Sequence, residues 1–292
     1  METRFVLLGG TGFFGAALAR ELRSRGLAVV TVARGTRGAP DVRADIVRTP
    51  HLLGRIFEPG DTVVYVLGLS PLKRPLGGRR RYREVHLDGV RSALAAAVER
   101  GVSRFVQVSA LGVSRGCGAA YGETKARASA ELRAAARREA RPGQVQTLVV
   151  EPSILFGDGS EIVQALDLAA RFPAVPLPHI RPAIRPIHVD DAARRLADAV
   201  TAEQMPPRLE LTGPELLSFN QLAAAYLKPR GARVLLLPRP VSRLLVRVVS
   251  RLRIPGLPAE LDAMLAMDNA GEGPPRPEEL TRFTRWAVAL RR

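Results

Sequence analysis

The chain has 292 residues, of which 46% are hydrophobic and 25% charged, which is enough apolar material for a full-sized core. Its one cysteine, Cys117, excludes an internal disulfide, and no apolar run approaches the roughly 20 residues of a membrane-spanning helix. The net charge of +16 is almost entirely arginine spread along the chain, and aromatic residues make up only 5%, so nucleic-acid binding is not expected. A strand begins almost at once, which leaves no room for a targeting peptide and favours a cytoplasmic location.

The N-terminus carries a glycine turn between an apolar run and a helical pattern. The apolar run at residues 5–8 enters the turn at 9–15, and a helix-forming run at 16–22 leaves it. Glycines in such a turn keep it tight, let the backbone approach a pyrophosphate and let the helix pack on the strand. The pattern indicates a dinucleotide-binding unit; the alternative is a packing turn in another kind of α/β domain. The predicted cofactor contacts in the turn are Gly9, Thr11, Gly12, Phe13, Phe14 and Gly15.

Short apolar runs alternate with helical patterns through the first half of the chain. Strands are predicted at residues 4–8, 28–33, 62–67, 104–108 and 146–150. Helices are predicted at residues 12–25, 83–100 and 121–141. This alternation indicates an α/β fold with a Rossmann-type, doubly wound parallel sheet. The segment 69–81 is predicted to be a loop at the carboxyl end of the third of these strands, where open α/β sheets bind ligands, so Leu67 and Gly68 are predicted cofactor contacts.

From Glu151 onward, prolines become more frequent and the helical patterns become shorter. We therefore predict a nucleotide-binding domain at 1–150 and a smaller substrate lobe at 151–292, interleaved with the last elements of the sheet. Ser218 and Gln221 predict a capping box for a helix at 219–226, and residues 274–277 predict a loop before a final short helix.

A basic amphipathic helix is predicted from Val241 to Leu252. Its apolar residues recur at helical spacing, and arginines occupy the opposite face. One interpretation is a helix that packs on the core of the lobe with a solvated arginine face. The other is a docking element for an anionic membrane or a protein complex, which would make the protein peripheral to a membrane.

Tyr121 and Lys125 form a YxxxK pattern at the start of a predicted helix, twelve residues after Ser109. Residues four apart lie one above the other on a helix, and an ammonium near a phenol lowers the pKa of that phenol. Tyr121 is therefore the predicted general acid and base, passing a proton to or from a substrate oxygen while hydride moves to or from a nicotinamide. Lys125 is predicted to tune this tyrosine and hold the cofactor ribose, and Ser109 to orient the substrate.

The run after the second predicted strand indicates which nicotinamide cofactor binds. Residues 32–37 contain no carboxylate for the ribose hydroxyls of NAD, but they contain Arg34 and Arg37. Arginine at this place accommodates a 2′-phosphate, so we predict NADP(H) over NAD(H). The alternative is two solvated loop arginines in an arginine-rich chain.

Several stretches together resemble the extended or atypical short-chain dehydrogenases/reductases of the NAD-dependent epimerase/dehydratase type. They are the glycine loop at 9–15, the strand end at 108–110, the pair Tyr121 and Lys125, the turn at 151–157 and the stretch at 187–191. The resemblance implies that Pro152 flanks the nicotinamide and that Asp45 and Ile46 contact the adenine. Residues 109–112 and the length look most similar to the branch that includes the nucleotide-binding accessory subunit of respiratory complex I.

The sequence also departs from the pattern of this family. Ala110 and Leu111 follow Ser109 where many active members carry further serines, and Glu151 replaces an arginine before the turn proline. His86 stands where a structural asparagine often lies, and we interpret both His86 and His188 as structural.

Two functions therefore stay open for this chain. One is an NADP(H)-dependent oxidoreductase or epimerase acting on a small carbonyl or sugar-like substrate. The other is a nucleotide-holding subunit or assembly factor of a membrane complex, with little or no turnover. The sequence does not identify the small-molecule substrate, because specificity is set in the C-terminal lobe.

Overall fold

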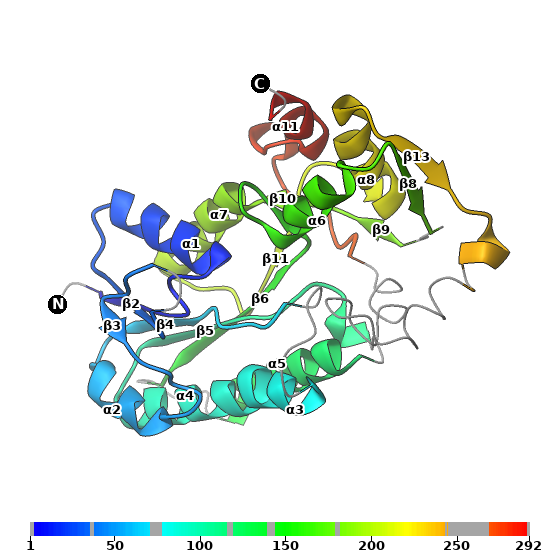
Figure 1. Ribbon diagram of the computed structural model, residues 1–292. Coiled ribbons are helices and arrows are strands. Elements are labelled where there is room, and N and C mark those ends of the chain that lie inside the picture. Colours follow the sequence, from blue (N-terminus) through cyan, green and yellow to red (C-terminus); the bar gives the residue numbers. More distant parts are fainter. Residues whose placement is uncertain are drawn as a thin grey trace.

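The computed structural model describes residues 3–35, 38–70, 78–115, 119–138, 144–178, 182–242, 244 and 269–290. The central strands are β1 (Phe5–Leu8), β2 (Val29–Ala33), β3 (Val42–Arg43), β4 (Thr62–Tyr65), β5 (Arg104–Val108), β6 (Gln146–Pro152) and β11 (Arg208–Leu211). They form a seven-stranded sheet in the order β11-β6-β5-β4-β1-β2-β3 (Figure 1). Every neighbouring pair is parallel, which confirms the predicted doubly wound α/β fold.

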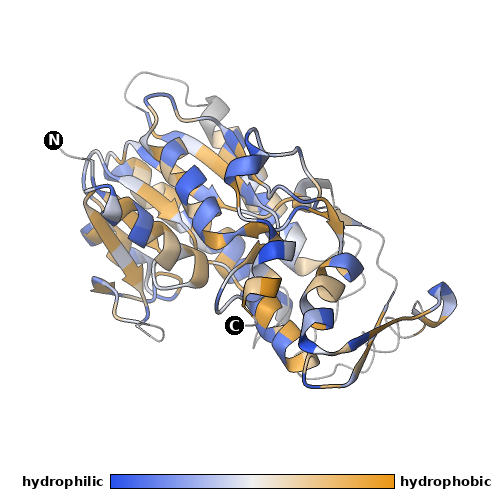
Figure 2. Ribbon diagram, turned by 90° about the horizontal axis from the view of Figure 1, so that it is seen from above, coloured by the Kyte–Doolittle hydropathy of each residue, from blue (hydrophilic) through white to orange (hydrophobic). Residues whose placement is uncertain are grey.

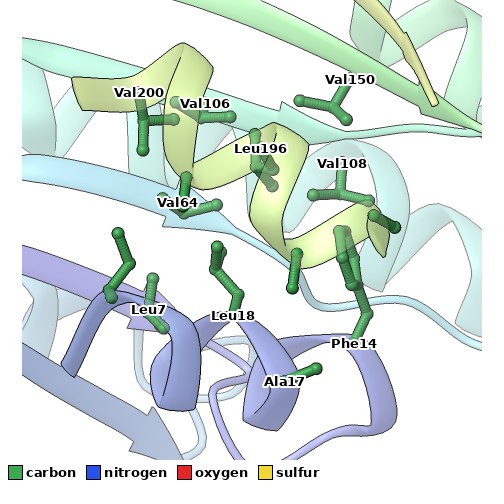
Figure 3. Packing of buried hydrophobic residues seen from close by; sticks show 14 of the residues in the cluster. Leu7, Phe14, Ala17, Leu18, Val64, Val106, Val108, Val150, Leu196 and Val200 are labelled. Carbon is green, nitrogen blue, oxygen red and sulfur yellow. The ribbon is translucent and has the colours of Figure 1, made fainter. Parts of the chain in front are cut away.

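Helices cover both faces of this sheet. On one face α1 (Phe13–Ser24) and α7 (Val189–Thr201) pack over a core that includes Leu7, Val64 and Val106 (Figure 3). On the other face α4 (Gly89–Glu99) and α5 (Ala120–Arg138) pack over Val6, Val63 and their neighbours, beside the short helix α2 (Leu53–Ile56) and the 3-10 turn η1 (Pro50–Leu52). Burial on both faces explains why the central strands β1, β4 and β5 are rich in apolar residues, and Figure 2 shows hydrophobic colour along the sheet.

Several element boundaries differ from the prediction. Strand β3 is only two residues long, and β11 carries charged side chains at a sheet edge, so neither gives a strand signal in the sequence. The helix predicted to begin at residue 83 begins at Gly78 instead, inside the predicted loop. Here α3 (Gly78–Arg83), the π-helical turn η2 (Glu84–Asp88) and α4 follow one another without a break. Tyr82 is buried and anchors this early start.

The C-terminal lobe has its own small core. Among its described residues, the helices are α6 (Glu161–Ala169), α8 (Phe219–Leu227) and α11 (Phe283–Ala289), with 3-10 turns η4 (Lys228–Arg230) and η5 (Pro277–Glu279). Its strand pairs are β7 (Leu155–Phe156) with β10 (Ile187–His188), β8 (Ala174–Leu177) with β13 (Arg233–Leu236), and β9 (Ala183–Ile184) with β12 (Leu217–Ser218). The predicted capping box of Ser218 and Gln221 at the start of α8 is confirmed.

The second half of the chain also contributes to the central layers. Strand β6 runs through residue 150, β11 adds the seventh strand beside it, and α7 packs against α1. Most of the helix predicted from Val241 to Leu252 lies outside the described residues, as do Arg37 and Cys117. Among the described residues, no helix is both long enough and apolar enough to span a membrane.

Candidate functional site

The glycine turn between β1 and α1 is packed too closely for side chains. Gly9 has a φ of 95°, and a Cβ there would lie 3.1 Å from Leu67. A Cβ at Gly15 would lie less than 3.0 Å from the carbonyl oxygen of Gly9, and one at Gly12 would lie 3.3 Å from the same atom. The first turn of α1 therefore rests directly on the loop, which is the geometry that brings a backbone against a pyrophosphate.

The N-terminus of α1 is suited to an anion. Within the described residues, its N-cap Gly12 makes no side-chain capping bond, and the first turn of the helix holds no acidic residue. In contrast, Ser160, His188 and Ser218 cap α6, α7 and α8 with side-chain hydrogen bonds. The N–H groups and dipole at an uncapped N-terminus attract phosphate oxygens. The residues present thus fit a dinucleotide pyrophosphate.

The turn lies at the point where the strand order reverses. Strands β1 and β4 are parallel neighbours, and β2 and β5 lie on opposite sides of this pair. Ligands of open α/β sheets bind outside the carboxyl ends of the strands at such a point. Leu67 and Gly68 follow β4 here, and a Cβ at Gly68 would lie 3.7 Å from the Nζ atom of Lys125. The structure therefore brings the glycine turn, the end of β4 and the YxxxK lysine together.

Lys125 is buried at the carboxyl end of β5. Its ammonium donates hydrogen bonds to the carbonyl oxygens of Val108 (3.1 Å) and Ser109 (3.2 Å) and lies 5.6 Å from the centroid of the Tyr121 ring. Burial lowers the pKa of Lys125 to about 8. A cation is thus held beside the phenol of Tyr121, which is the arrangement that stabilises a phenolate.

Ser109 faces α5. Its side chain is buried, and its hydroxyl accepts a hydrogen bond from the hydroxyl of Ser129 at 2.9 Å. Its amide donates to the carbonyl of Val150 at 2.7 Å, which fixes the end of β5 against β6. The role of Ser109 in orienting a substrate stays a prediction.

His86 lies within the group of rings around Tyr121. Its ring centroid is 5.4 Å from those of Tyr121 and Tyr82. Its Nε2 accepts a hydrogen bond from the amide of Leu69 (3.0 Å), so its proton is on Nδ1, which lies 3.1 Å from the hydroxyl oxygen of Thr124. Burial, together with the charge on Lys125, holds the pKa of His86 well below its usual range. His86 is therefore a neutral connector between the segment after β4 and the start of α5.

Two arginines lie at the carboxyl ends of β2 and β3. Arg34 is exposed, and its carbonyl accepts a hydrogen bond from Nε of Arg43 at 3.1 Å. A Cβ at Gly35 would lie 2.8 Å from the same Nε, so Arg43 lies against the turn. Sequence reasoning missed Arg43, because β3 is too short to show in the pattern. The carboxylate of Asp41 is engaged elsewhere, by Thr31 and Arg23.

The two predicted adenine contacts, Asp45 and Ile46, differ in the burial of their side chains: Asp45 is partly exposed and Ile46 is buried. The carboxylate of Asp45 accepts a hydrogen bond from the amide of Arg48 at 3.3 Å, whereas the Ile46 side chain is buried in the core beneath α4. Thr11 of the glycine turn lies near Gly38 in the β2–β3 loop. A Cβ at Gly38 would be 3.9 Å from the Thr11 side chain. The glycine turn and this loop thus border the same region.

The turn after β6 approaches the glycine turn from the other side. Pro152 ends β6, and a Cβ at Gly157 would lie 3.6 Å from the Phe13 ring and 3.3 Å from Nε2 of His188. Nδ1 of His188 accepts a hydrogen bond from the amide of Asp190 at 3.3 Å and caps α7, which confirms its structural interpretation. Phe13 thus marks the point where the two turns meet.

Glu151 is used inside the fold. Its carboxylate is 1% exposed and pairs with Arg208 on β11 at 2.7 Å and with Arg133 on α5 at 3.5 Å. A buried carboxylate in such a cluster joins β6, β11 and α5.

Comparison with known proteins places the chain in a family. A model of the NAD dependent epimerase/dehydratase family matches residues 5–159. Over 198 residues the chain is 30% identical to the ceramide reductase of Caulobacter vibrioides, covering 65% of this chain and 58% of that protein. Over 237 residues it is 27% identical to the divinyl chlorophyllide a 8-vinyl-reductase of Cucumis sativus, covering 69% and 50%. The chain thus spans less than two thirds of the length of these relatives.

Solved structures share the fold over most of the chain. Human epimerase family protein SDR39U1 with NADPH superimposes with a TM-score of 0.73 at 18% identity, covering 98% of each chain. UDP-glucose 4-epimerase of Thermus thermophilus with NAD gives a TM-score of 0.66 at 18% identity, covering 82% of this chain and 88% of that one. The family match, the glycine turn and the parallel sheet agree, and the chain belongs to the NAD-dependent epimerase/dehydratase family.

Proposed function

We propose that this protein is an NADPH-dependent reductase of a small carbonyl compound. The observation that carries the proposal is the meeting of Lys125 and Tyr121 with Gly68 and the glycine turn, where the strand order reverses. Both curated relatives named above are reductases, which supports reduction over epimerisation. The carboxylate of Glu151 is paired with Arg133 and Arg208 inside the fold, so it is not free to contact a sugar nucleotide. This supports the same choice.

The described side chains would divide the chemistry among them. When bound, the nicotinamide would supply hydride to the carbonyl carbon. Tyr121 would donate its phenolic proton to the carbonyl oxygen, so that an alcohol forms and a phenolate remains. The buried ammonium of Lys125 would stabilise that phenolate. Backbone groups at the start of α1 would hold the pyrophosphate, and Pro152 would lie beside the nicotinamide.

The preference for NADPH is part of the proposal. Arg34 follows β2 and Arg43 ends the neighbouring strand β3, and the two meet where a 2′-phosphate would be placed. Charge-assisted hydrogen bonds from guanidinium groups suit this dianion.

Single-turnover oxidation of bound NADPH tests the function. Aldehydes, ketones of increasing chain length and quinones serve as acceptors. Tyr121→Phe removes the transferable proton, so we expect a rate lower by roughly 10²–10⁴ with nearly unchanged NADPH affinity. Val98→Ala, at an exposed position on α4, is the control expected to react like the wild type. A Tyr121→Phe variant that reduces an acceptor at the wild-type rate would contradict the role of Tyr121.

The second candidate is a nucleotide-holding subunit of a membrane complex. The bond between Ser109 and Ser129 favours it, because the hydroxyl predicted to orient a substrate is engaged inside the fold. The helix predicted from Val241 to Leu252 would then be the docking element. Exchange of co-purified nucleotide separates the candidates: exchange within one catalytic cycle supports an enzyme, and retention of unexchanged nucleotide over hours supports a holding role.

A further inference from the structure

A tyrosine of the central sheet forms a hydrogen bond to the backbone of the helix that carries His86. Tyr65 ends β4 and is 1% exposed, and its hydroxyl donates a hydrogen bond to the carbonyl of Val85 at 2.6 Å. A Cβ at Gly89 would lie less than 3.0 Å from this hydroxyl oxygen. The hydroxyl therefore occupies space that any other residue at position 89 would fill.

This contact coincides with a shift in the hydrogen bonds of the helix. In an α-helix the amide of Gly89 would bond to the carbonyl of Val85, four residues earlier. Here it bonds to the carbonyl of Glu84, five residues earlier, and Tyr65 takes the carbonyl of Val85. A hydroxyl that captures a helix carbonyl is a physical cause of such a π turn, because it satisfies the acceptor that the ladder releases.

The π turn contains His86. From this turn the imidazole reaches the amide of Leu69 after β4 and the hydroxyl of Thr124 on α5, and its ring meets that of Tyr121 edge to face. Return of residues 84–89 to α-helical register would rotate His86 about the helix axis. Both hydrogen bonds of the imidazole would then be lost.

We propose that Tyr65 and Gly89 are positioning residues, which hold His86 and through it Tyr121 in the geometry for proton transfer. The proposal rests on the proposed role of Tyr121 as the proton donor. Tyr65 and Gly89 act through the helix, by the hydrogen bond of Tyr65 to Val85 and by the space that Gly89 leaves for that hydroxyl.

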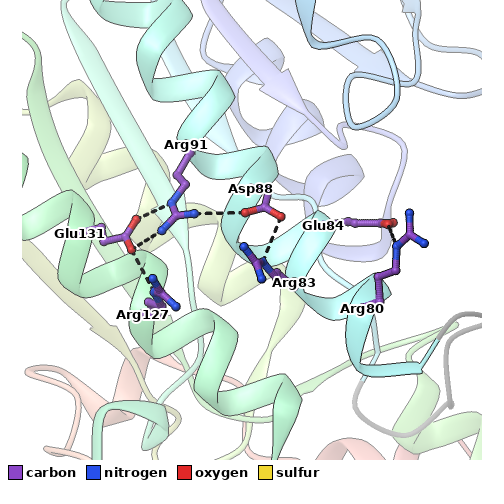
Figure 4. Close-up of polar contacts among 7 residues, drawn as sticks. All are labelled: Arg80, Arg83, Glu84, Asp88, Arg91, Arg127 and Glu131. Atoms are coloured by element: carbon purple, nitrogen blue, oxygen red, sulfur yellow. Dashed lines mark hydrogen bonds and ion pairs between the residues drawn. The ribbon is translucent and has the colours of Figure 1, made fainter.

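An ion pair outside the π turn docks α4 on α5, and two further pairs involve the first and last residues of the turn, Glu84 and Asp88. Arg91 on α4 forms two hydrogen bonds of 2.7 Å with Glu131 on α5, and Asp88 accepts a hydrogen bond from Arg91 at 3.2 Å (Figure 4). Arg80 pairs with Glu84 within the helix at 2.8 Å. The helix is therefore expected to stay docked when the Tyr65 hydroxyl is removed, so that the change is confined to the π turn.

The test compares Tyr65→Phe, Gly89→Ala and the double variant. Tyr65→Phe keeps the ring and removes the hydroxyl, whereas Gly89→Ala displaces the hydroxyl. Nitrogen-15 NMR at constant pH reads the tautomer of His86, assigned with His86→Gln, and hydrogen exchange reads the protection of the Leu69 amide. We expect each variant to lose the NMR signature of a proton on Nδ1 of His86. Hydrogen exchange of the Leu69 amide should become faster by on the order of 10-fold or more. Because both changes act through one contact, the double variant should match the single variants.

Matched controls separate this effect from a general loss of packing. Tyr226→Phe removes another tyrosine hydroxyl, bonded to Asp167 in the C-terminal lobe, and Gly54→Ala adds a methyl where nothing lies within 4 Å. Both should leave the His86 signature and the Leu69 protection unchanged. Persistence of both signals in Tyr65→Phe would overturn the proposal.

A kinetic readout connects the π turn to the reaction. In Tyr65→Phe the single-turnover rate with the reducible carbonyl should fall on the order of 10- to 100-fold, with NADPH affinity within about twofold of the wild type. A changed tautomer with an unchanged rate would refute the positioning role. If no carbonyl compound is reduced by the wild type, the proposed function fails, while the NMR result still decides whether Tyr65 sets His86.

Discussion

At the scale of single residues, the buried ammonium of Lys125 makes stability depend on pH. Burial lowers its pKa from 10.5 to about 8, so between these values the unfolded chain binds more protons than the folded one. Burial of the charged ammonium therefore destabilises the folded protein in full below pH 8. This destabilisation decreases as the pH rises from 8 toward 10.5. Lys125→Met removes this dependence. We expect the stability of Lys125→Met, measured relative to the wild type, to be greatest at pH 7 and to fall as the pH rises toward 10.

Urea unfolding of wild type and Lys125→Met at several pH values checks this prediction. The loss of hydrogen bonds to Val108 and Ser109 adds an offset that does not vary with pH, so the slope of the difference is the relevant quantity. A difference in unfolding free energy that is constant from pH 7 to 10 would contradict a lowered pKa for Lys125.

Cofactor selectivity is also decided by single side chains. Arg34→Ala and Arg43→Ala should each weaken NADPH binding by about 1.5–3 kcal/mol, because each removes a charge-assisted bond to the 2′-phosphate. NADH affinity should barely change. Arg55→Ala, on α2, controls for the loss of one positive charge. Fluorescence titration with both cofactors measures this, and an equal loss for NADPH and NADH refutes the assignment.

At the scale of elements, the contact of α1 with the glycine turn allows a direct test. Gly15→Ala places a methyl against the backbone carbonyl of Gly9, which cannot move without shifting β1 or α1. Such overpacking should lower the free energy of unfolding by about 1–3 kcal/mol and weaken nucleotide binding. Gly54→Ala in α2 meets open space and should raise stability by roughly 0.5–1 kcal/mol. Similar thermal unfolding of the two variants would contradict this packing.

The elements also show what the sequence can predict. The glycine turn, five central strands and the YxxxK helix follow from local patterns of hydrophobicity and spacing, and the structure contains them. The π turn could not be predicted, because its cause is the hydroxyl of Tyr65, which lies 20 residues away from Val85 in the sequence. The role of His86 depends on that turn, so the sequence suggested only a structural histidine on a helix face.

At the scale of the whole molecule, Glu151 links elements from both halves of the chain. Arg208→Ala removes its better partner and leaves a buried carboxylate with Arg133 at 3.5 Å. Breaking a buried pair costs about 3–5 kcal/mol, and we expect about 2 kcal/mol here because Arg133 remains and Arg208 is partly exposed. Arg20→Ala breaks an exposed pair with Asp190 and should change stability by less than about 1 kcal/mol. Equal effects in chemical denaturation would show that the cluster does not hold β11 to β6.

The arrangement of the halves explains why the C-terminal region was harder to predict. Strand β11 belongs to the second half of the chain but pairs with β6 in the central sheet. Its Arg208 forms an ion pair with Glu151, and such charged residues hide the apolar pattern of a strand. The lobe itself is built from two- to four-residue strands whose pairing depends on contacts distant in sequence. Such short strands carry little periodicity, so the sequence predicted helices but no strands of the lobe: the capped helix α8 and the final short helix after the loop at 274–277, which is α11 in the structure.

The proposed chemistry requires that the glycine turn holds a nicotinamide dinucleotide, and calorimetric titration with NADPH measures this binding. Gly12→Asp puts a side chain and a negative charge at the uncapped start of α1, where the pyrophosphate would lie. Gly54→Asp adds the same charge on α2, where nothing lies within 4 Å of the new Cβ. We predict that wild type and Gly54→Asp bind NADPH alike and that folded Gly12→Asp does not bind it. Binding of NADPH to Gly12→Asp with wild-type affinity would show that the pyrophosphate does not lie at the start of α1.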